Sequence, residues 1–505
     1  MRVIPGSRLI ATGAPLNLAD RFLFLGKIET MIKLRVPPLY QKIVDVLGDR
    51  EAYLVGGAVR DLLLGEDIHD LDFALPEQVI PTARRVADGL EGDYYLLDAE
   101  RGAARVILYP LERKRLIVDF THFQGETIAD DLRARDFTIT AMGVSIHQPD
   151  HLLDPCGGTA DLQQKVIRSC SREALIADPL RAVRGVRMAV KYGFHILPDT
   201  QEQIRKVIPR LVEISAERMR DEFFRILEGP HQAAALQIMS QMGMLKDIVP
   251  GLEENLDLRI RTQRKLEEIL GGLGLDYEQD VAASSALGVL VHRLGDYREP
   301  LMNTLRCQLV PGRDLFQLIF FAALYLPDSG GKDDGKPELD PQPASRNSLQ
   351  LSNQEQQELS ASLRAAVQFR LLAGEGSIGR REIYRYFRDF SRAGVLGIFL
   401  SLASFLAQHD KTAPLKTWPV QLEAARTLLE AWWEFPEERV SPPRLLDGNQ
   451  LQEATGLPPG PRIGELLEAI REAQAVGKLT TREEAAVFAQ KLMNQGRMEG
   501  VDEGD

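Results

Sequence analysis

Two aspartates that stand one residue apart, Asp70 and Asp72, are the side chains of this chain best suited to chemistry. Polar and apolar residues alternate around them, which is typical of a strand and places both carboxylates on one face. Adjacent carboxylates suit Mg²⁺ that is bound jointly by the protein and by the phosphates of a nucleotide. By itself an Asp-x-Asp pair is more often a solvated strand edge, so the neighbouring sequence must decide.

A glycine turn precedes the aspartate pair. Residues 52–55 predict a buried strand, Gly56 and Gly57 follow it, and residues 59–64 predict the start of a helix. Backbone N–H groups at such a turn, together with the helix N-terminus, favour a bound phosphate. We therefore expect a triphosphate at the two glycines and at Arg60, although a Gly-Gly pair before a helix is usually only a turn.

Asp119 is the expected third carboxylate. Residues 115–120 alternate as a strand, and Ile117 and Asp119 share one face of it. We expect Asp119 to end this strand and to join the aspartate pair, because two-metal catalysis usually wants such a ligand. An isolated strand aspartate is more often a surface residue, so this assignment depends on its context.

Arg135 and Asp136 stand together just before an apolar helical patch. Arg135 can bind a phosphate or the edge of a sugar, and Asp136 can accept from ribose hydroxyls or fix Arg135. The structural alternative is a helix N-cap with a salt bridge.

A second constellation begins at Asp178, which is followed by Pro179 and Arg181. An Asp cap and a proline in the first turn predict a helix start that brings Asp178 and Arg181 near each other. Such a pair can read the Watson–Crick edge of C or A, whereas uracil and guanine would leave buried groups unpaired. Arg184 and Arg187 follow at three-residue intervals and are then available to the triphosphate. An Arg-rich helix is otherwise most often a solvated or ion-paired face.

Composition limits the class of protein. The 505 residues carry a net charge of −12, which argues against a protein that coats itself in nucleic acid but leaves room for a local basic face. No apolar run approaches the roughly 20 residues of a membrane span and no targeting segment is evident, so we expect a cytoplasmic protein without a membrane contact. Three widely spaced cysteines predict neither a disulfide framework nor a zinc site. No obligate protein partner is evident.

The periodicity changes along the chain. Between residues 53 and 166 strand and helix patterns alternate, which predicts an α/β head with one mixed sheet; beyond Asp161 only helical spacing is evident. Met31 is expected to be the native start. The expected modules are a disordered leader at 1–30, the head at 31–165, a helical neck at 166–230, a helical body at 231–348 and 349–440, and a helical tail at 441–505, with loops at 327–348 and 436–444.

In order and spacing, the motifs together resemble the bacterial tRNA nucleotidyltransferase/poly(A) polymerase family. They are GGAVRD at 56–61 with DLD at 70–72, RDFTI at 135–139, DPCGG at 154–158 with DL at 161–162, DPLR at 178–181 and ISAER at 214–218. The match covers roughly residues 50–228, and a fainter likeness continues to the end. It implies a nucleotidyltransferase head, a neck that selects the nucleotide, and body and tail modules that hold tRNA.

The resemblance implies addition of CMP and AMP from CTP and ATP to the 3′ end of tRNA by two-metal in-line transfer, with Mg²⁺ as the cofactor. It implies these roles for residues of this sequence: Mg²⁺ at Asp70 and Asp72 with Asp119 as the third carboxylate, the triphosphate at Gly57 and Arg60, the ribose region at Arg135 and Asp136, the base at Asp178 and Arg181, and the phosphates again at Arg184 and Arg187.

Three positions depart from the family pattern. Ala134 stands where an arginine is usual, with Arg133 one position earlier; Ala177 replaces a glutamate before Asp178; and Gln124 replaces an arginine. These changes bear on nucleotide switching more than on transfer itself. The alternatives are a poly(A) polymerase, which the acidic end at 499–505 disfavours, an enzyme that adds only CC or only A, and, from another class, a non-catalytic RNA-binding relative.

Two later segments extend the resemblance. Residues 318–328 are similar to a metal-dependent phosphohydrolase helix of some relatives, but Pro327 stands where a metal-binding histidine belongs, and only His231, His292 and His409 follow residue 195. We expect an eroded, metal-free remnant there. Residues 446–448 and 459–485 resemble the C-terminal segment of the family, where a helix N-terminus would meet tRNA phosphates; a simple helical pack is the alternative.

Overall fold

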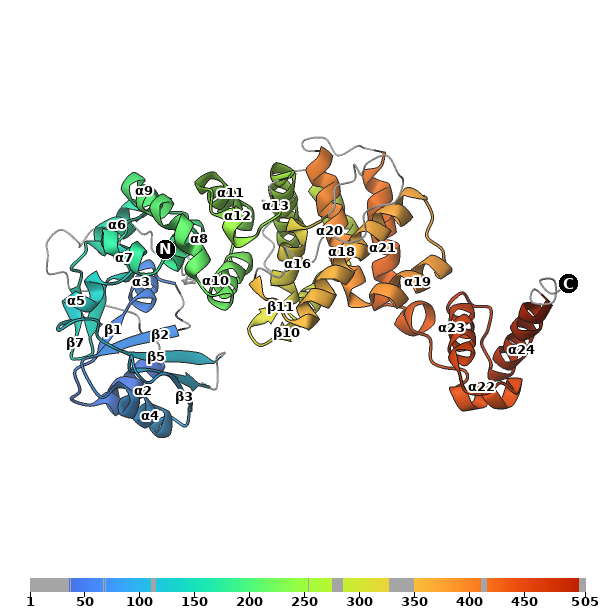
Figure 1. Cartoon of the computed structure of the whole chain (residues 1–505), viewed down its shortest axis with the longest axis horizontal. Coiled ribbons are helices and arrows are strands. Elements are labelled where there is room, and N and C mark those ends of the chain that lie inside the picture. The colour runs from blue at the N-terminus through green and yellow to red at the C-terminus, as the bar shows by residue number, and fades with distance from the viewer. Residues whose placement is uncertain are drawn as a thin grey trace, which may run out of the picture. The chain divides into compact units, whose positions relative to one another are not determined.

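A computed structural model provides the structure of the chain (Figure 1). It describes residues 36, 38–66, 68, 70–109, 115–252, 254–274, 285–326, 349–409 and 416–498. The predicted leader, Met31, Pro327, the loop at 327–348 and the acidic end at 499–505 lie outside the described residues. The chain divides into an N-terminal unit, Met1–Glu213, and a C-terminal unit, Ile214–Asp505. This boundary falls inside the neck expected at 166–230; the other module boundaries stay predictions.

The N-terminal unit contains the mixed sheet that the sequence predicts. Its seven strands run in the order β3-β4-β5-β2-β1-β6-β7, and β2 and β5 are its parallel neighbours. The strands are β1 Tyr53–Val55, β2 Asp70–Leu75, β3 Asp93–Asp98, β4 Ala103–Leu108, β5 Leu116–His122, β6 Gly143–Ser145 and β7 Gln148–Leu153. Asp119 does not end its strand as expected, because β5 continues to His122 to pair with β2 and β4.

The N-terminal unit also contains helices. They are α2 Pro38–Leu47, α3 Gly57–Leu64, α4 Val79–Gly89, α5 Ile128–Arg133, α6 Gly158–Gln164, α7 Arg172–Ala177, α8 Leu180–Tyr192 and α9 Pro198–Val207. In Figure 1, α2 and α4 lie together on one side of the sheet. On that side Phe73 stacks between Tyr40 and Phe120, with ring centroids 6.0 and 5.4 Å away. The alternation in β2 buries Leu71 and Phe73 and leaves Asp70 exposed toward the other face.

α7 and α8 are separated at Asp178 and Pro179, where the sequence predicts a helix start. Proline at the first turn of α8 ends the preceding helix, because a residue before proline is pushed out of the helical region. The backbone of α8 then comes close to the head: a Cβ added at Gly185 would lie 2.7 Å from Cζ of Phe137. The neck is not purely helical, since β8 (Val166–Ile167) and β9 (His195–Ile196) pair there.

The C-terminal unit is mostly helical, as expected. Its helices are α10 Ala216–Glu228, α11 Gln232–Met242, α12 Leu245–Ile248, α13 Leu256–Gly272, α14 Ser285–Leu294, α15 Arg298–Leu305, α16 Leu315–Leu324, α18 Asn353–Gly374, α19 Arg380–Phe390, α20 Arg392–His409, α21 Trp418–Trp433, α22 Gly448–Thr455, α23 Pro461–Ala475 and α24 Arg482–Met498. Two short strands, β10 (Gln308–Val310) and β11 (Arg313–Asp314), were not predicted. The loop expected at 436–444 contains a π-helical turn, Pro436–Val440.

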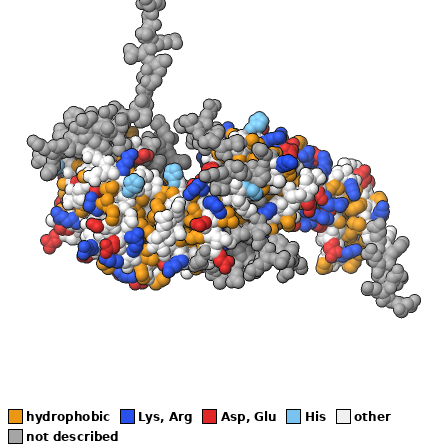
Figure 2. Space-filling model, turned by 90° about the horizontal axis from the view of Figure 1, so that it is seen from above, with side chains coloured by type: hydrophobic (Ala, Val, Ile, Leu, Met, Phe, Trp, Pro, Cys, Tyr) orange, Lys and Arg blue, Asp and Glu red, His pale blue; other side chains and the backbone are white. Residues whose placement is uncertain are grey.

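The last three helices have a core of their own, which includes Leu451, Leu466 and Ala489. On the face shown in Figure 2, acidic and basic side chains are interspersed. Within the described ranges, no single helix is long and apolar enough to cross a membrane; α19 and α20 meet that test only as a pair, bent by 106° at their junction.

Candidate active site

The predicted carboxylates meet on the face of the sheet opposite α2 and α4. Asp72 of β2 stands opposite Asp119 of β5 in the parallel register, and Asp70 precedes Asp72 on the same face. Burial raises the pKa of Asp72 to about 6; Arg135 opposes this, and the charges of Asp119 and Asp70 add to it. Burial and the two neighbouring carboxylates both disfavour the ionised form of Asp72, and a bound cation would oppose that effect.

Asp119 already has a partner. The guanidinium of Arg105, on β4, donates to both carboxylate oxygens of Asp119 at 2.7 and 2.8 Å. Arg105 also lies within electrostatic reach of Asp70 and Asp72. Sequence reasoning missed this residue, although a lone arginine in an otherwise apolar strand was a usable signal.

The glycine turn comes very close to these carboxylates. Gly56 has φ 76°, and a Cβ added there would lie 2.8 Å from Nη1 of Arg135 and 3.3 Å from Oδ2 of Asp72. Only glycine fits both the backbone conformation and the space. The turn, the arginine and the carboxylate that the sequence placed at three separate motifs are therefore neighbours.

Arg135 is held by a residue that the sequence analysis did not name. Asp131 accepts from Nε and Nη2 of Arg135 at 3.2 and 3.0 Å, one helical turn earlier. It also accepts from the backbone N–H of Gln124 at 3.0 Å. The expectation that Asp136 could fix Arg135 is wrong for this reason; spacing of four residues was the available signal for Asp131.

Asp136 is instead a buried anchor. Its carboxylate accepts from the backbone N–H of Phe137 at 2.9 Å and from the hydroxyl of Thr140 at 2.6 Å, and it pairs with Arg184 of α8 at 3.1 Å. Burial would raise the pKa of Asp136, but Arg184 and Thr140 outweigh it, so the pKa is lowered. Asp136 thus fastens the head to α8 in its ionised form.

Arg60 also connects α3 with α8. The side chain is only 9% exposed, pairs with Asp61 at 2.8 Å and lies 4.5 Å from the ring centroid of Tyr192. Tyr192 in turn donates to Asp61 at 3.0 Å. A Cβ added at Gly57 would lie 3.2 Å from Nη2 of Arg60. The buried guanidinium of Arg60 therefore lies directly beside the glycine turn.

Asp178 and Arg181 flank the break between α7 and α8. Oδ1 of Asp178 accepts from the backbone N–H of Leu180 at 3.3 Å, which is close to the predicted cap. Nη1 of Arg181 donates to the carbonyl oxygens of Ala134 and Ala174, at 3.0 and 3.1 Å. The guanidinium is therefore fixed beside the segment that carries Arg135.

Arg184 and Arg187 continue along α8 at the spacing that places them on one side of the helix. Arg184 acts electrostatically on Asp72 as well as on Asp136, and Arg187 acts on the hydroxyl of Tyr192. All the predicted site residues thus belong to one neighbourhood of the N-terminal unit.

The acidic side chains of the site determine which metal ion it could hold. Over the described ranges, no three His, Cys, Asp or Glu side chains are arranged to hold a metal together. Mg²⁺ is commonly bound by one or two carboxylates and substrate phosphates, without an all-protein cage. Asp70 and Asp72 fit that requirement. Asp119 is less available as a metal ligand, because Arg105 donates to both of its carboxylate oxygens.

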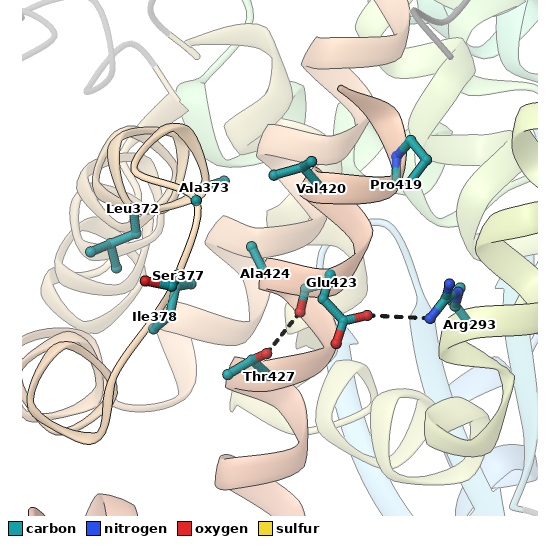
Figure 3. A pocket seen from close by; sticks show the side chains of 11 residues that line it. Arg293, Leu372, Ala373, Ser377, Ile378, Pro419, Val420, Glu423, Ala424 and Thr427 are labelled. Carbon is teal, nitrogen blue, oxygen red and sulfur yellow. Dashed lines mark hydrogen bonds and ion pairs between the residues drawn. The ribbon is translucent and has the colours of Figure 1, made fainter. Parts of the chain in front are cut away.

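A separate pocket lies in the C-terminal unit (Figure 3). It has a volume of about 510 Å³ and is lined by side chains of α14, α18, α21 and the loop after α18. Its charged residues, Arg293 and Glu423, pair with each other at 3.3 Å. It holds neither paired carboxylates nor grouped cations, so it does not resemble the site on the sheet. Of the segment expected to be an eroded remnant, residues 318–324 lie in the buried helix α16; that it is a metal-free remnant stays a prediction.

Comparisons with known proteins bear on the same regions. Residues 52–168 match the family described as "Poly A polymerase head domain", and residues 193–256 match "Probable RNA and SrmB- binding site of polymerase A". The solved structure of the Bacillus stearothermophilus CCA-adding enzyme in complex with CTP aligns with 92% of this chain and 100% of its own, with a TM-score of 0.60 at 22% identity. That likeness shows a shared fold.

Two relatives match most of the chain in sequence. The CC-adding tRNA nucleotidyltransferase of Geobacter sulfurreducens is 31% identical over 87% of this chain and 91% of its own. The A-adding tRNA nucleotidyltransferase of Deinococcus radiodurans is 31% identical over 87% of this chain and 95% of its own. The chain therefore belongs to the tRNA nucleotidyltransferase/poly(A) polymerase family and is a tRNA nucleotidyltransferase.

Proposed function

We propose that this enzyme adds CMP and AMP, from CTP and ATP, to the 3′ end of tRNA and so builds or repairs the CCA end. The single observation that carries the proposal is the close approach of Gly56, Asp72 and Arg135 on the face of the sheet opposite α2 and α4. It joins a phosphate-binding turn, a cation and a metal-ligating carboxylate within one small volume. Solved relatives of the same fold are described as bound to CTP, to ATP and to tRNA, which supports these substrates.

The reaction is an in-line attack of the RNA 3′-hydroxyl on the α-phosphate of the nucleotide, with pyrophosphate as the leaving group. Asp70 and Asp72 would hold Mg²⁺, which supplies activation of the hydroxyl and neutralisation of developing charge. Gly57 and Arg60 hold the triphosphate through backbone N–H groups and positive charge. Arg135, oriented by Asp131, binds phosphate or the sugar edge, and Asp136 keeps this segment docked on α8.

Base selection is assigned to Asp178 and Arg181. The carboxylate accepts from the exocyclic amine of C or A, and the guanidinium donates to the neighbouring ring atom. The two carbonyl oxygens that accept from Arg181 fix the direction of its guanidinium, which is the preorganisation that discrimination needs. Arg184 and Arg187 contribute positive charge for the phosphates along α8.

The number and order of additions are the finer part of the proposal. Relatives that add only CC and only A are equally similar to this chain, so enzymes restricted to CC or to A are the alternatives, and poly(A) addition is another. The test supplies tRNA ending at the discriminator base, at C or at CC, with CTP and ATP separately and together. Full CCA addition gives three added nucleotides from the first substrate with both nucleotides. A product that stops after CC would indicate a CC-adding enzyme, and extension only of the tRNA that ends at CC would indicate an A-adding enzyme. A long A tract would indicate a poly(A) polymerase.

A further inference from the structure

The row of functional side chains does not end at Asp119. Asp119 on β5 is the register partner of Arg105 on β4, and Arg105 is the register partner of Tyr95 on β3. Register partners on neighbouring strands share one face of a sheet. A line therefore runs from Asp72 through Asp119 and Arg105 to Tyr95, at the edge strand of the sheet.

The outer end of this line is open and aromatic. Tyr95 is 48% exposed and Tyr109, just after β4, is 62% exposed. Tyr109 lies within electrostatic reach of Tyr95, and its hydroxyl donates to Asp93 at 2.8 Å. The side chain of Arg105 is 38% exposed although both oxygens of Asp119 hold its guanidinium. We name these three residues, Tyr95, Arg105 and Tyr109, the tyrosine shelf.

The opposite face of the same strand is occupied. Tyr94 alternates with Tyr95 and stacks under Arg84 of α4, whose guanidinium lies 4.9 Å from the ring centroid. The tyrosine shelf is thus on the catalytic face and not on the face that α4 covers. The hydroxyl of Tyr109 bonds to Asp93, but about half or more of each of the two tyrosine side chains remains exposed.

We propose that the tyrosine shelf binds the RNA strand just upstream of the reacting 3′-hydroxyl; this rests on the proposed function. Exposed aromatic rings on a sheet stack nucleobases of any sequence, and a fixed guanidinium adds a flat cationic surface. Three strand spacings separate Tyr95 from Asp72, about 14 Å, or about four stacked nucleotides. That separation places the shelf beyond the incoming nucleotide, and its continuity with the carboxylate row favours RNA over a protein partner.

The test measures equilibrium binding of a labelled tRNA that ends at the discriminator base, without nucleotide, so that its readout does not depend on catalysis. Tyr95→Ala and Tyr109→Ala are each expected to weaken the Kd at least fivefold, the scale of one lost stacking contact, while Tyr95→Phe keeps the wild-type Kd. The matched control is Leu96→Ala, because Leu96 is 52% exposed on the same strand but faces the other side. In steady state, the tyrosine variants raise KM for tRNA and leave KM for CTP unchanged.

Equal Kd values for Tyr95→Ala, Tyr109→Ala and Leu96→Ala would overturn the proposal. So would an altered oligomeric state of Tyr95→Ala with an unchanged RNA affinity, since that result would assign the face to a protein contact. Circular dichroism of each variant checks folding, and the ring-keeping Tyr95→Phe separates stacking from loss of structure. Failure of the proposed function would be recognised differently, as absent incorporation of CMP and AMP by the wild-type enzyme.

Discussion

Asp72 and Asp119 stand opposite each other on neighbouring parallel strands, and Asp119 is held by a two-pronged contact from Arg105. Burial raises the pKa of Asp72 to about 6; Arg135 and Arg184 oppose this shift, and the charges of Asp119 and Asp70 add to it. Asp72, the residue proposed to hold Mg²⁺, is therefore a carboxyl group whose ionised form is disfavoured by its surroundings.

Asp72→Asn is expected to stabilise the protein while abolishing transfer. A raised folded-state pKa means that the native state holds more protons than the unfolded chain, so stability falls as pH rises from about 4 to 6. Without Mg²⁺, the variant should gain about 3 kcal/mol at pH 7, a gain that disappears near pH 4. Thermal unfolding at several pH values measures it. The control Asp70→Asn, at an exposed position, should change stability little; an Asp72→Asn variant that is less stable at pH 7 contradicts the interpretation.

Gly56→Ala is expected to reduce transfer at least 100-fold, because its Cβ would displace Arg135 or Asp72. Gly48→Ala is the matched control: Gly48 also has a positive φ, 60°, but a Cβ there meets nothing within 4 Å. Both variants pay a backbone cost of about 1–2 kcal/mol, so an activity difference between them reports the close approach. Similar kcat/KM for the two variants would show that space at Gly56 is unimportant.

Asp131→Asn is expected to raise KM for the nucleotide about tenfold, because Arg135 loses its charged partner and its fixed direction. Asp130→Asn is the neighbouring control. Asp130 closes the capping box of α5 with Thr127 and does not contact the guanidinium of Arg135 in the hydrogen bonds described for it. The control removes a capping contact of α5 and should change activity little. Steady-state kinetics with CTP and ATP separate the two, and equal KM values argue against the role of Asp131.

Asp178→Ala is expected to relax nucleotide choice. Loss of the acceptor for the exocyclic amine should lower the preference for CTP over UTP by about 10- to 100-fold, mainly through slower CTP incorporation. Competition between the two nucleotides on one tRNA substrate measures the ratio. A variant that is slow with both nucleotides and still discriminates as the wild type does would assign selection to other residues.

Much of the N-terminal unit followed from local pattern. Alternation predicted the strands around Asp72 and Asp119, and a proline after Asp178 predicted the start of a helix there. What the sequence did not reveal depends on contacts between distant segments. Arg105 reaches Asp119 from the neighbouring strand β4, and Arg184 reaches Asp136 from α8. The spacing of four residues between Asp131 and Arg135 could have predicted their ion pair. The adjacent Asp136 was predicted as the partner because it shares a motif with Arg135.

The short elements were missed for another reason. β8 and β9 have two residues each, too few for a period to be recognised, and they exist because tertiary packing aligns their backbones. The extension of β5 past Asp119 has the same cause, since its last residues pair with β2 on one side and β4 on the other.

The central claim is that Asp70 and Asp72 carry nucleotidyl transfer to the 3′ end of tRNA. It is tested most directly by incorporation of labelled CMP and AMP into tRNA by Asp70→Ala, beside wild-type enzyme and with tRNA binding measured in parallel. The account predicts that tRNA affinity is kept and that incorporation falls by at least about three orders of magnitude, the scale on which loss of charge stabilisation acts. Incorporation at the wild-type rate by Asp70→Ala would contradict it.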